Sequence, residues 1–399
     1  MKPVKASLIV GVLALALFSV RLGEPSSYVF DEISYVNAAR ALVHGAAGLQ
    51  MEPDEWRHWG WHPPLGKVLM AASMVVCGDN PFGWRFGSAV AGAIAIASTL
   101  LLTYLLLDSL SLAVLASVLM LLNNFTFVLS RVAMAEAFIM MFVITGLTAW
   151  VAAVKGIYPR WMLLLAGVLF GCAVSVKWSA LVLLAVLALC TVVLWFKNEN
   201  VGRVGLWFVA LSLGAVPLLT YCLSFWPVCR TLNAPFSLPE VWSMTVFIFD
   251  YHHHATGNPA INSPWYAWVL RTSPERSLNY MVGNFAVCWL GIVALVVCLY
   301  RFIKKPALAE GLVVILYGAS LLQWPIIARN FTFYYYYAIP ATFLCVAIPI
   351  ALRRNPGWSV LGVRVTLLCG LAAAVVFLVF YPKMAALNAP WDCALVCVP

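Results

Sequence analysis

The chain alternates long apolar segments with short charged ones, and this alternation constrains its fold more than any other feature. A helix needs about 20 apolar residues to cross the hydrocarbon core of a bilayer. Eleven segments reach or approach that length, and they cover residues 6–22, 83–107, 111–128, 133–154, 161–176, 180–196, 204–225, 283–300, 309–328, 334–352 and 361–381. The pattern predicts an all-α integral membrane protein in which residues 1–399 form a single bundle of about eleven transmembrane helices.

Composition and charge exclude two other classes of protein. The sequence is 64% hydrophobic and 10% charged, whereas a soluble domain is about half apolar and a quarter charged. The formal net charge is +9. Because much of that charge lies in short loops on one side of the predicted bundle, it indicates membrane orientation. We expect no nucleic-acid partner.

The basic residues also predict which way the bundle faces. With the N-terminus in the cytoplasm, the cytoplasmic segments hold 12 of the 24 Lys and Arg residues but only three of the 15 Asp and Glu residues. Short loops rich in Lys and Arg stay inside, so we expect a multi-pass protein of the plasma (inner) membrane in this orientation. An odd number of spans places the C-terminus outside, where Cys393 and Cys397 would meet an oxidising environment that permits a disulfide bond.

Two long loops, about 23–82 and 226–282, lie on the outer face in this orientation. Loops of this length are usually functional, so the site is expected there. In the first loop, apolar residues from Ile33 to Val43 recur at helical spacing ahead of Gly45, which predicts an amphipathic helix. A second apolar run, 68–76, follows in the same loop.

Two acidic residues, Asp31 and Glu32, precede the first amphipathic helix. Asp31 occupies the position of an N-cap, where free amides and the helix dipole would keep a carboxylate ionised. The sequence leaves two interpretations open for Asp31: a plain helix cap or a catalytic carboxylate.

The string His62-Pro63-Pro64-Leu65-Gly66-Lys67 introduces the second apolar run. The prolines favour an extended entry into a helix, and Gly66 permits close approach. Lys67 then falls in the first turn, where a helix N-terminus attracts anions. The alternative is a rigid elbow with a lysine that reaches towards the lipid headgroups.

Three further cations, Arg85, Arg131 and Lys177, lie at the outer ends of predicted spans, and Glu136 follows Arg131 by five residues. Charges near membrane depth are costly and usually face partners or cavities. Contact with lipid headgroups is the alternative for each cation. Because all three belong to the same leaflet, a shared anionic ligand is favoured.

The second outer loop carries three consecutive histidines, 252–254, followed by Ser263, Trp265 and Trp268. Consecutive histidines point in different directions on a regular element, and no Cys/His set has metal-binding spacing. We therefore predict no metal and no cofactor. The two tryptophans suit either anchoring at the membrane interface or stacking against a sugar.

Taken in order, these motifs resemble those of the protein O-mannosyltransferase family, and in particular its short bacterial-type members. The resemblance covers most of the chain, although Glu136 stands where the family commonly has Asp. The matching strings are Phe30-Asp31-Glu32, His62-Pro63-Pro64-Leu65-Gly66-Lys67, Trp84-Arg85-Phe86, Ser130-Arg131, Ser175-Val176-Lys177-Trp178 and Ser263-Pro264-Trp265 with Trp268.

The resemblance implies a type-C glycosyltransferase fold and an inverting transfer reaction. Mannose, or a related hexose, would pass from a polyprenyl-phosphate (or dolichyl-phosphate) donor to Ser or Thr hydroxyls of exported proteins. No metal would be needed, and membrane lipids would surround the enzyme. Two rival functions stay open: a transferase that acts on a lipid or glycan acceptor, and a transporter or flippase of lipid-linked sugars.

The chemistry of such a transfer assigns roles to the candidate residues. The attacking hydroxyl must lose a proton, which suits Asp31 as general base, with Glu32 holding substrate or orienting the loop. The leaving phosphate gains negative charge that cations stabilise, which suits Arg85, Arg131 and Lys177, with Lys67 and His62 as further candidates. Candidates for contacts to sugar or acceptor are Glu136, His252, Ser263, Trp265 and Trp268.

Overall fold

The computed structural model of the protein describes residues 2–45, 61–197, 205–254, 262–274, 278, 281–327, 332–353, 357, 359–360 and 363–385. Within these ranges the chain is almost entirely helical, which confirms the predicted class. A short antiparallel pair, β1 (Ser359–Val360) and β2 (Val363–Arg364), joins two helices. Cys393 and Cys397 lie outside the described residues.

Nine helical segments in the described part of the chain are long and apolar enough to cross a membrane. Two of them are composite: one contains a π-helical turn and the other begins as a 3-10 helix. They are α1 (Lys2–Ser19), α5 (Pro81–Leu107), α8 (Glu136–Val154), α10 (Ser179–Phe196), α11–η3–α12–α13 (Leu206–Ala210, Leu211–Ala215, Val216–Ser224, Trp226–Thr231), α15 (Phe285–Lys304), α16 (Leu308–Ile326), η6–α17 (Tyr334–Tyr337, Ala338–Leu352) and α18 (Val365–Met384).

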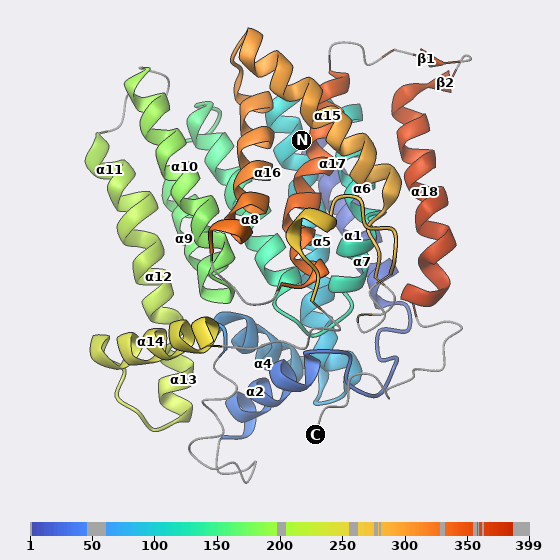
Figure 1. Cartoon of the computed structure of the whole chain (residues 1–399). Coiled ribbons are helices and arrows are strands. Elements are labelled where there is room, and N and C mark those ends of the chain that lie inside the picture. The colour runs from blue at the N-terminus through green and yellow to red at the C-terminus, as the bar shows by residue number, and fades with distance from the viewer. Residues whose placement is uncertain are drawn as a thin grey trace.

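The other two predicted spans form shorter helices. Segment 161–176 is α9 (Met162–Val176), and segment 111–128 divides into α6 (Leu110–Leu121) and α7 (Asn124–Leu129). The division follows from Asn123, whose side chain accepts a hydrogen bond from the Phe125 amide and so begins a new helix. Figure 1 shows α6 and α9 upright within the bundle, beside the longer helices.

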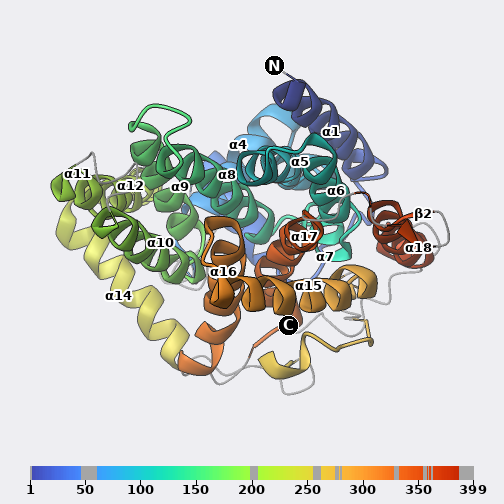
Figure 2. The ribbon, with the colours of Figure 1, turned by 90° about the horizontal axis from the view of Figure 1, so that it is seen from above.

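The bundle is organised around α5 and α8. Helix α5 packs against α1, α4 and α8, and α8 packs against α9, which in turn packs against α12. Figure 2 shows α9–α12 on one side of the bundle and α1, α6 and α18 on the other. Helix α5 lies so close to Ser130 that position 92 must be glycine. A Cβ atom on Gly92 would lie 2.0 Å from Ser130 Oγ.

Four shorter helices gather at one end of the bundle, the lower end in Figure 1. They are α2 (Glu32–His44), α4 (Leu65–Cys77), α13 and α14 (Leu238–His254). Helix α2 confirms the amphipathic helix predicted in the first outer loop and is followed by Gly45, with φ 79°. Helix α4 contains the second apolar run of that loop. Helix α14 lies in a segment described from sequence only as a loop, although its buried residues Val241, Met244 and Ile248 recur at helical spacing.

A polar latch fixes α2 to the connection between α4 and α5. Arg40 of α2 donates two hydrogen bonds to the Asp79 carboxylate, at 2.7 and 2.9 Å. The Trp84 indole N–H donates to the same carboxylate, and the Arg40 guanidinium lies 4.9 Å from the Trp84 ring. The latch therefore holds the helix that begins directly after Asp31.

Candidate active site

Asp31 precedes the first residue of α2, but its side chain does not cap the helix. The backbone carbonyl of Asp31 accepts hydrogen bonds from Ser34 and Tyr35, whereas the carboxylate makes no capping bond. Instead Oδ2 accepts a hydrogen bond from the Tyr335 hydroxyl at 3.4 Å. The carboxylate is thus turned towards η6 and away from the helix amides, which argues against the interpretation as a plain cap.

Burial among protein groups raises the pKa of Asp31 to about 7. The negative charge of Glu136 raises it further, while Lys177 and the Tyr335 hydroxyl act in the opposite direction. Burial thus acts against the ionisation that a helix N-terminus would favour. A carboxylate with a pKa near 7 suits general-base catalysis at neutral pH.

Lys177, which directly follows α9, lies beside the groups that surround Asp31. Its Nζ donates a hydrogen bond to Glu136 Oε1 at 2.6 Å, and both side chains are buried. The ammonium lies 4.3 Å from the centre of the Tyr336 ring and 5.1 Å from that of Tyr335. Since an ammonium has three donors and Glu136 takes one, Lys177 retains donors for an anion.

Lys177 also lines a cavity of about 940 Å³ between α9, α10, α12, α14 and α16. The wall is mainly apolar, with Val182, Leu184 and Leu218 among its residues, and His62 and His252 join Lys177 among the polar ones. A large apolar cavity with a few convergent polar groups is the usual form of a ligand site. This one suits a ligand that combines an anionic group with a hydrocarbon tail.

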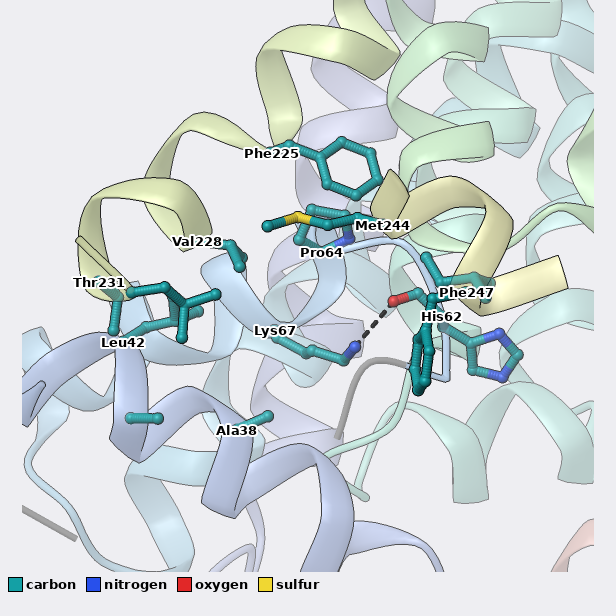
Figure 3. A pocket seen from close by; sticks show the side chains of 13 residues that line it. Ala38, Leu42, His62, Pro64, Lys67, Phe225, Val228, Thr231, Met244 and Phe247 are labelled. Carbon is teal, nitrogen blue, oxygen red and sulfur yellow. Dashed lines mark hydrogen bonds between the residues drawn. The ribbon is translucent and has the colours of Figure 1, made fainter. Parts of the chain in front are cut away.

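A smaller cavity of about 80 Å³ lies beside α2, α4, α13 and α14 (Figure 3). Lys67 lines it among apolar side chains and donates a hydrogen bond to the His62 carbonyl oxygen at 2.8 Å. Burial lowers the pKa of Lys67 to about 7. His62 lines both cavities, and its ring lies 4.9 Å from that of His252. It therefore connects Lys67 in the smaller cavity with His252 and Lys177 in the larger one.

Glu32 has a different environment from its neighbour Asp31. Arg85 Nε and Nη2 donate to its two oxygens at 2.7 Å, and the amides of Val29 and Ala133 donate as well. The remaining Arg85 bonds go to the carbonyl oxygens of Leu22, Pro25 and Ser27. Of the two roles predicted for Glu32, this geometry fits the one that orients the loop.

Arg85 and Arg131 do not line either cavity, contrary to the expected set of three phosphate-binding cations. Arg131 donates to the carbonyl oxygens of Phe18, Val20 and Arg21 at the end of α1, and its guanidinium lies 5.2 Å from the Phe127 ring. Arg85 therefore ties the first outer loop to the bundle, and Arg131 ties down the end of α1. Only Lys177 of the three is placed to meet a ligand in the large cavity.

Of the candidates from the second outer loop, some line the large cavity and others support neighbouring segments. His252 lines the large cavity, whereas Trp268 is fully buried, donates its indole N–H to the Ser263 carbonyl and packs against Trp324. Ser263 accepts a hydrogen bond from Arg271. Trp265, in the short helix η5 (Trp265–Ala267), is half-buried. Ser263 and Trp268 thus support the segment around η6.

Sequence analysis missed the tyrosines 334–337, which it assigned to the start of a span. All four are buried in η6, and Tyr335 contacts Asp31 while Tyr335 and Tyr336 face Lys177. The signal was present in the sequence, because four consecutive hydroxyls in an apolar segment all need partners.

Among the described residues, no three His, Cys, Asp or Glu side chains come together as a metal site would require.

Known sequences that resemble this chain come from one family. The family described as dolichyl-phosphate-mannose-protein mannosyltransferase matches residues 8–233. A polyprenol-phosphate-mannose–protein mannosyltransferase of Mycolicibacterium smegmatis is 24% identical, over 95% of this chain and 89% of that protein. Proteins of the same name from Mycobacterium tuberculosis and Corynebacterium glutamicum are also 24% identical, over 83% and 80% of this chain and 76% of each protein.

Solved structures share the fold at lower identity. The S. cerevisiae protein O-mannosyltransferase Pmt1-Pmt2 complex bound to the sugar donor aligns with a TM-score of 0.79 and 12% identity, over 96% of this chain and 90% of that chain. ArnT from Cupriavidus metallidurans bound to undecaprenyl phosphate aligns with a TM-score of 0.60 and 14% identity, over 95% and 71%. The fold is that of type-C glycosyltransferases. Because the family match spans more than half of the sequence, this multi-pass membrane protein belongs to the dolichyl-phosphate-mannose-protein mannosyltransferase family.

Proposed function

We propose that the protein transfers mannose, or a related hexose, from a polyprenyl-phosphate donor to Ser or Thr hydroxyls of exported proteins. One observation carries the proposal. The buried carboxylate of Asp31 and the ammonium of Lys177 meet around Tyr335, and Lys177 opens onto the large apolar cavity. In this proposal Asp31 is the base, and Lys177 is the cation that binds the donor phosphate at the large cavity.

The donor would bind with its hydrocarbon chain along the apolar wall and its phosphate near Lys177. Lysine binds phosphate through charge-assisted hydrogen bonds, which are stronger than neutral ones. Lys67, His62 and His252 would surround the same anion, because His62 joins the two cavities. An anion would also favour the charged form of Lys67, which burial alone disfavours.

The transfer would proceed as a single displacement. The acceptor hydroxyl oxygen forms a bond to the anomeric carbon while the bond from that carbon to the phosphate oxygen breaks, so the configuration inverts. The hydroxyl proton passes to Asp31, and the electron pair of the broken bond stays on the phosphate. Lys177 stabilises the charge that develops there, and Glu32, paired with Arg85, fixes the loop that presents Asp31.

The proposed site would face the outside of the plasma membrane, with the N-terminus in the cytoplasm. The distribution of charge supports this orientation. Helices α2, α4 and α14 surround the site at one end of the bundle. At the other end, Lys155 directly follows α8, and Arg301 and Lys304 lie in the last turn of α15. Loops rich in Lys and Arg remain in the cytoplasm.

A second candidate function is sugar transfer to a lipid or glycan, since the fold is shared with ArnT. Purified protein in lipid nanodiscs, given radiolabelled polyprenyl-phosphate mannose, a Ser/Thr-rich peptide and a lipid acceptor, separates the two. We expect the label in the peptide. Label in the lipid alone would support the second candidate, and the absence of transfer to either acceptor would contradict the proposed reaction.

A further inference from the structure

We propose that Tyr335 is a positioning residue that holds the Asp31 carboxylate in line with Lys177. This inference rests on the proposed function and adds a residue to its site. Tyr335 contacts both groups: its hydroxyl donates to Asp31 Oδ2 at 3.4 Å, and its ring centre lies 5.1 Å from Lys177 Nζ. Tyr335 therefore links the base and the cation through one side chain.

The ring of Tyr335 is itself fixed by aromatic neighbours. Phe333 stacks on it with ring centres 5.4 Å apart, and Phe30 meets it edge-on at 5.9 Å. Phe30 has φ 50°, a left-handed conformation that is costly for a bulky residue and persists only when its surroundings hold it. Since Phe30 directly precedes Asp31, these contacts fix both ends of the Tyr335–Asp31 hydrogen bond.

The hydrogen bond occupies one oxygen of the carboxylate. Within the described part of the chain, Asp31 Oδ1 accepts no hydrogen bond, so this oxygen is left for the acceptor hydroxyl. A hydroxyl that donates to a carboxylate also favours its ionised form, which a general base needs. Tyr335 thereby orients the Asp31 carboxylate and favours its ionised form.

The titratable and charged groups that face this pair can be named for the described residues. Asp31 faces Glu136, Lys177 and Tyr335. Tyr335 also faces Tyr35 and Tyr336. Glu136 opposes ionisation of Asp31 and Lys177 favours it, and substitution of Tyr335 by Phe changes neither. The effect of the lost hydroxyl on the ionisation of Asp31 can therefore be measured separately from the effects of Glu136 and Lys177.

The variant Tyr335→Phe keeps the ring and removes the hydroxyl. We expect the acid limb of the pH profile of kcat/KM for peptide mannosylation to move up by about half a pH unit, because the lost hydrogen bond is long at 3.4 Å. This is a roughly threefold loss of rate below the midpoint. The rate should recover at higher pH, and binding of polyprenyl phosphate should be unchanged. Tyr335→Leu, which also removes the ring beside Lys177, should weaken that binding.

Tyr337→Phe is the matched control, because the Tyr337 hydroxyl bonds with Tyr317 at 3.0 Å and makes no contact with Asp31. Its pH profile should superimpose on that of the parent enzyme. An unchanged midpoint in Tyr335→Phe, or an equal loss of rate at every pH, would overturn the inference while peptide mannosylation by the parent enzyme still stands. Failure of the parent enzyme to mannosylate any peptide would overturn the proposed function and this inference with it.

Discussion

At the scale of single residues, the adjacent acids Asp31 and Glu32 differ because their surroundings differ. Glu32 accepts four hydrogen bonds, two of them from Arg85, and is enclosed in a structural network. Asp31 accepts one from Tyr335 and faces Lys177 near the large cavity. A fully bonded carboxylate suits a support role, whereas a buried carboxylate with a free oxygen suits proton transfer.

The raised pKa of Asp31 predicts how the activity depends on pH. The base must be ionised, and below its pKa of about 7 the protonated fraction grows with each step of acidification. We expect kcat/KM to fall roughly tenfold per pH unit below that value. Peptide mannosylation measured between pH 5 and 8.5 tests this, and a flat profile across the range would be inconsistent with Asp31 as base.

Lys177 should act through the donor. Lys177→Met removes a charge-assisted contact to phosphate, which is worth about 1.5–3 kcal/mol, so affinity for polyprenyl phosphate should fall roughly tenfold or more. Because Glu136 would be left unpaired, the double variant with Glu136→Gln is the better test. Lys155→Met, at the other end of the bundle, is the control. Equal affinity for polyprenyl phosphate in the double variant and the parent would show that Lys177 does not bind the donor phosphate.

Arg85 should act through stability. Arg85→Met leaves the Glu32 carboxylate buried without its cation, and breaking a buried pair costs about 3–5 kcal/mol. We expect a lower Tm in detergent, partly restored when Glu32→Gln is added. If Arg85→Met had the parental Tm and lost only donor binding, the result would support Arg85 as a phosphate-binding residue.

At the scale of helices, hydropathy predicted the bundle because apolar length alone decides whether a segment can span a bilayer. It missed α14, which is too polar and too short to be identified as a span, and the division of 111–128, which depends on the cap formed by Asn123. The motifs located the acids and cations, but their spacing in sequence did not reveal their partners. Arg85 and Lys177 look alike in sequence, and only packing separates them.

The side of α10 that lines the large cavity should determine how tightly donors with long hydrocarbon chains bind. Ala185 lies on the cavity side of α10 and is exposed there, so Ala185→Trp fills part of the cavity without disturbing the core. We expect a higher KM for an undecaprenyl donor than in the parent, and a smaller rise for a farnesyl donor. Ala210→Trp, an exposed alanine of α11 that does not line the cavity, is the control. Equal effects on both donors would mean that the hydrocarbon chain of the donor binds elsewhere.

At the scale of the whole molecule, the two ends of the bundle differ in kind. One end carries α2, α4 and α14 around the acids and cations of the proposed site, and the other carries short connections. The groups proposed for chemistry lie in or beside the segments that join spans. This arrangement fits a transferase at one membrane face better than a transporter, which would need its binding groups near mid-membrane.

The orientation is testable with reporter fusions. Fusions after residues 157, 200, 303 and 356 should report a cytoplasmic location, and a fusion at the C-terminus should report the outside, because an odd number of spans separates the two ends. A cytoplasmic signal at the C-terminus would contradict the eleven-span arrangement. It would also require one of the long loops to lie on the other side of the membrane.

The most direct test of the account is the turnover of Asp31→Asn, measured with purified enzyme, a defined donor and a defined peptide. Asn keeps the size of the side chain and can still accept the Tyr335 hydrogen bond, but it cannot take the acceptor proton. We expect turnover to fall by about 10²–10⁴-fold, with Tm and donor binding close to those of the parent, and Glu32→Gln to affect Tm more than Asp31→Asn does. Near-normal transfer by Asp31→Asn would contradict the assignment of Asp31 as the general base.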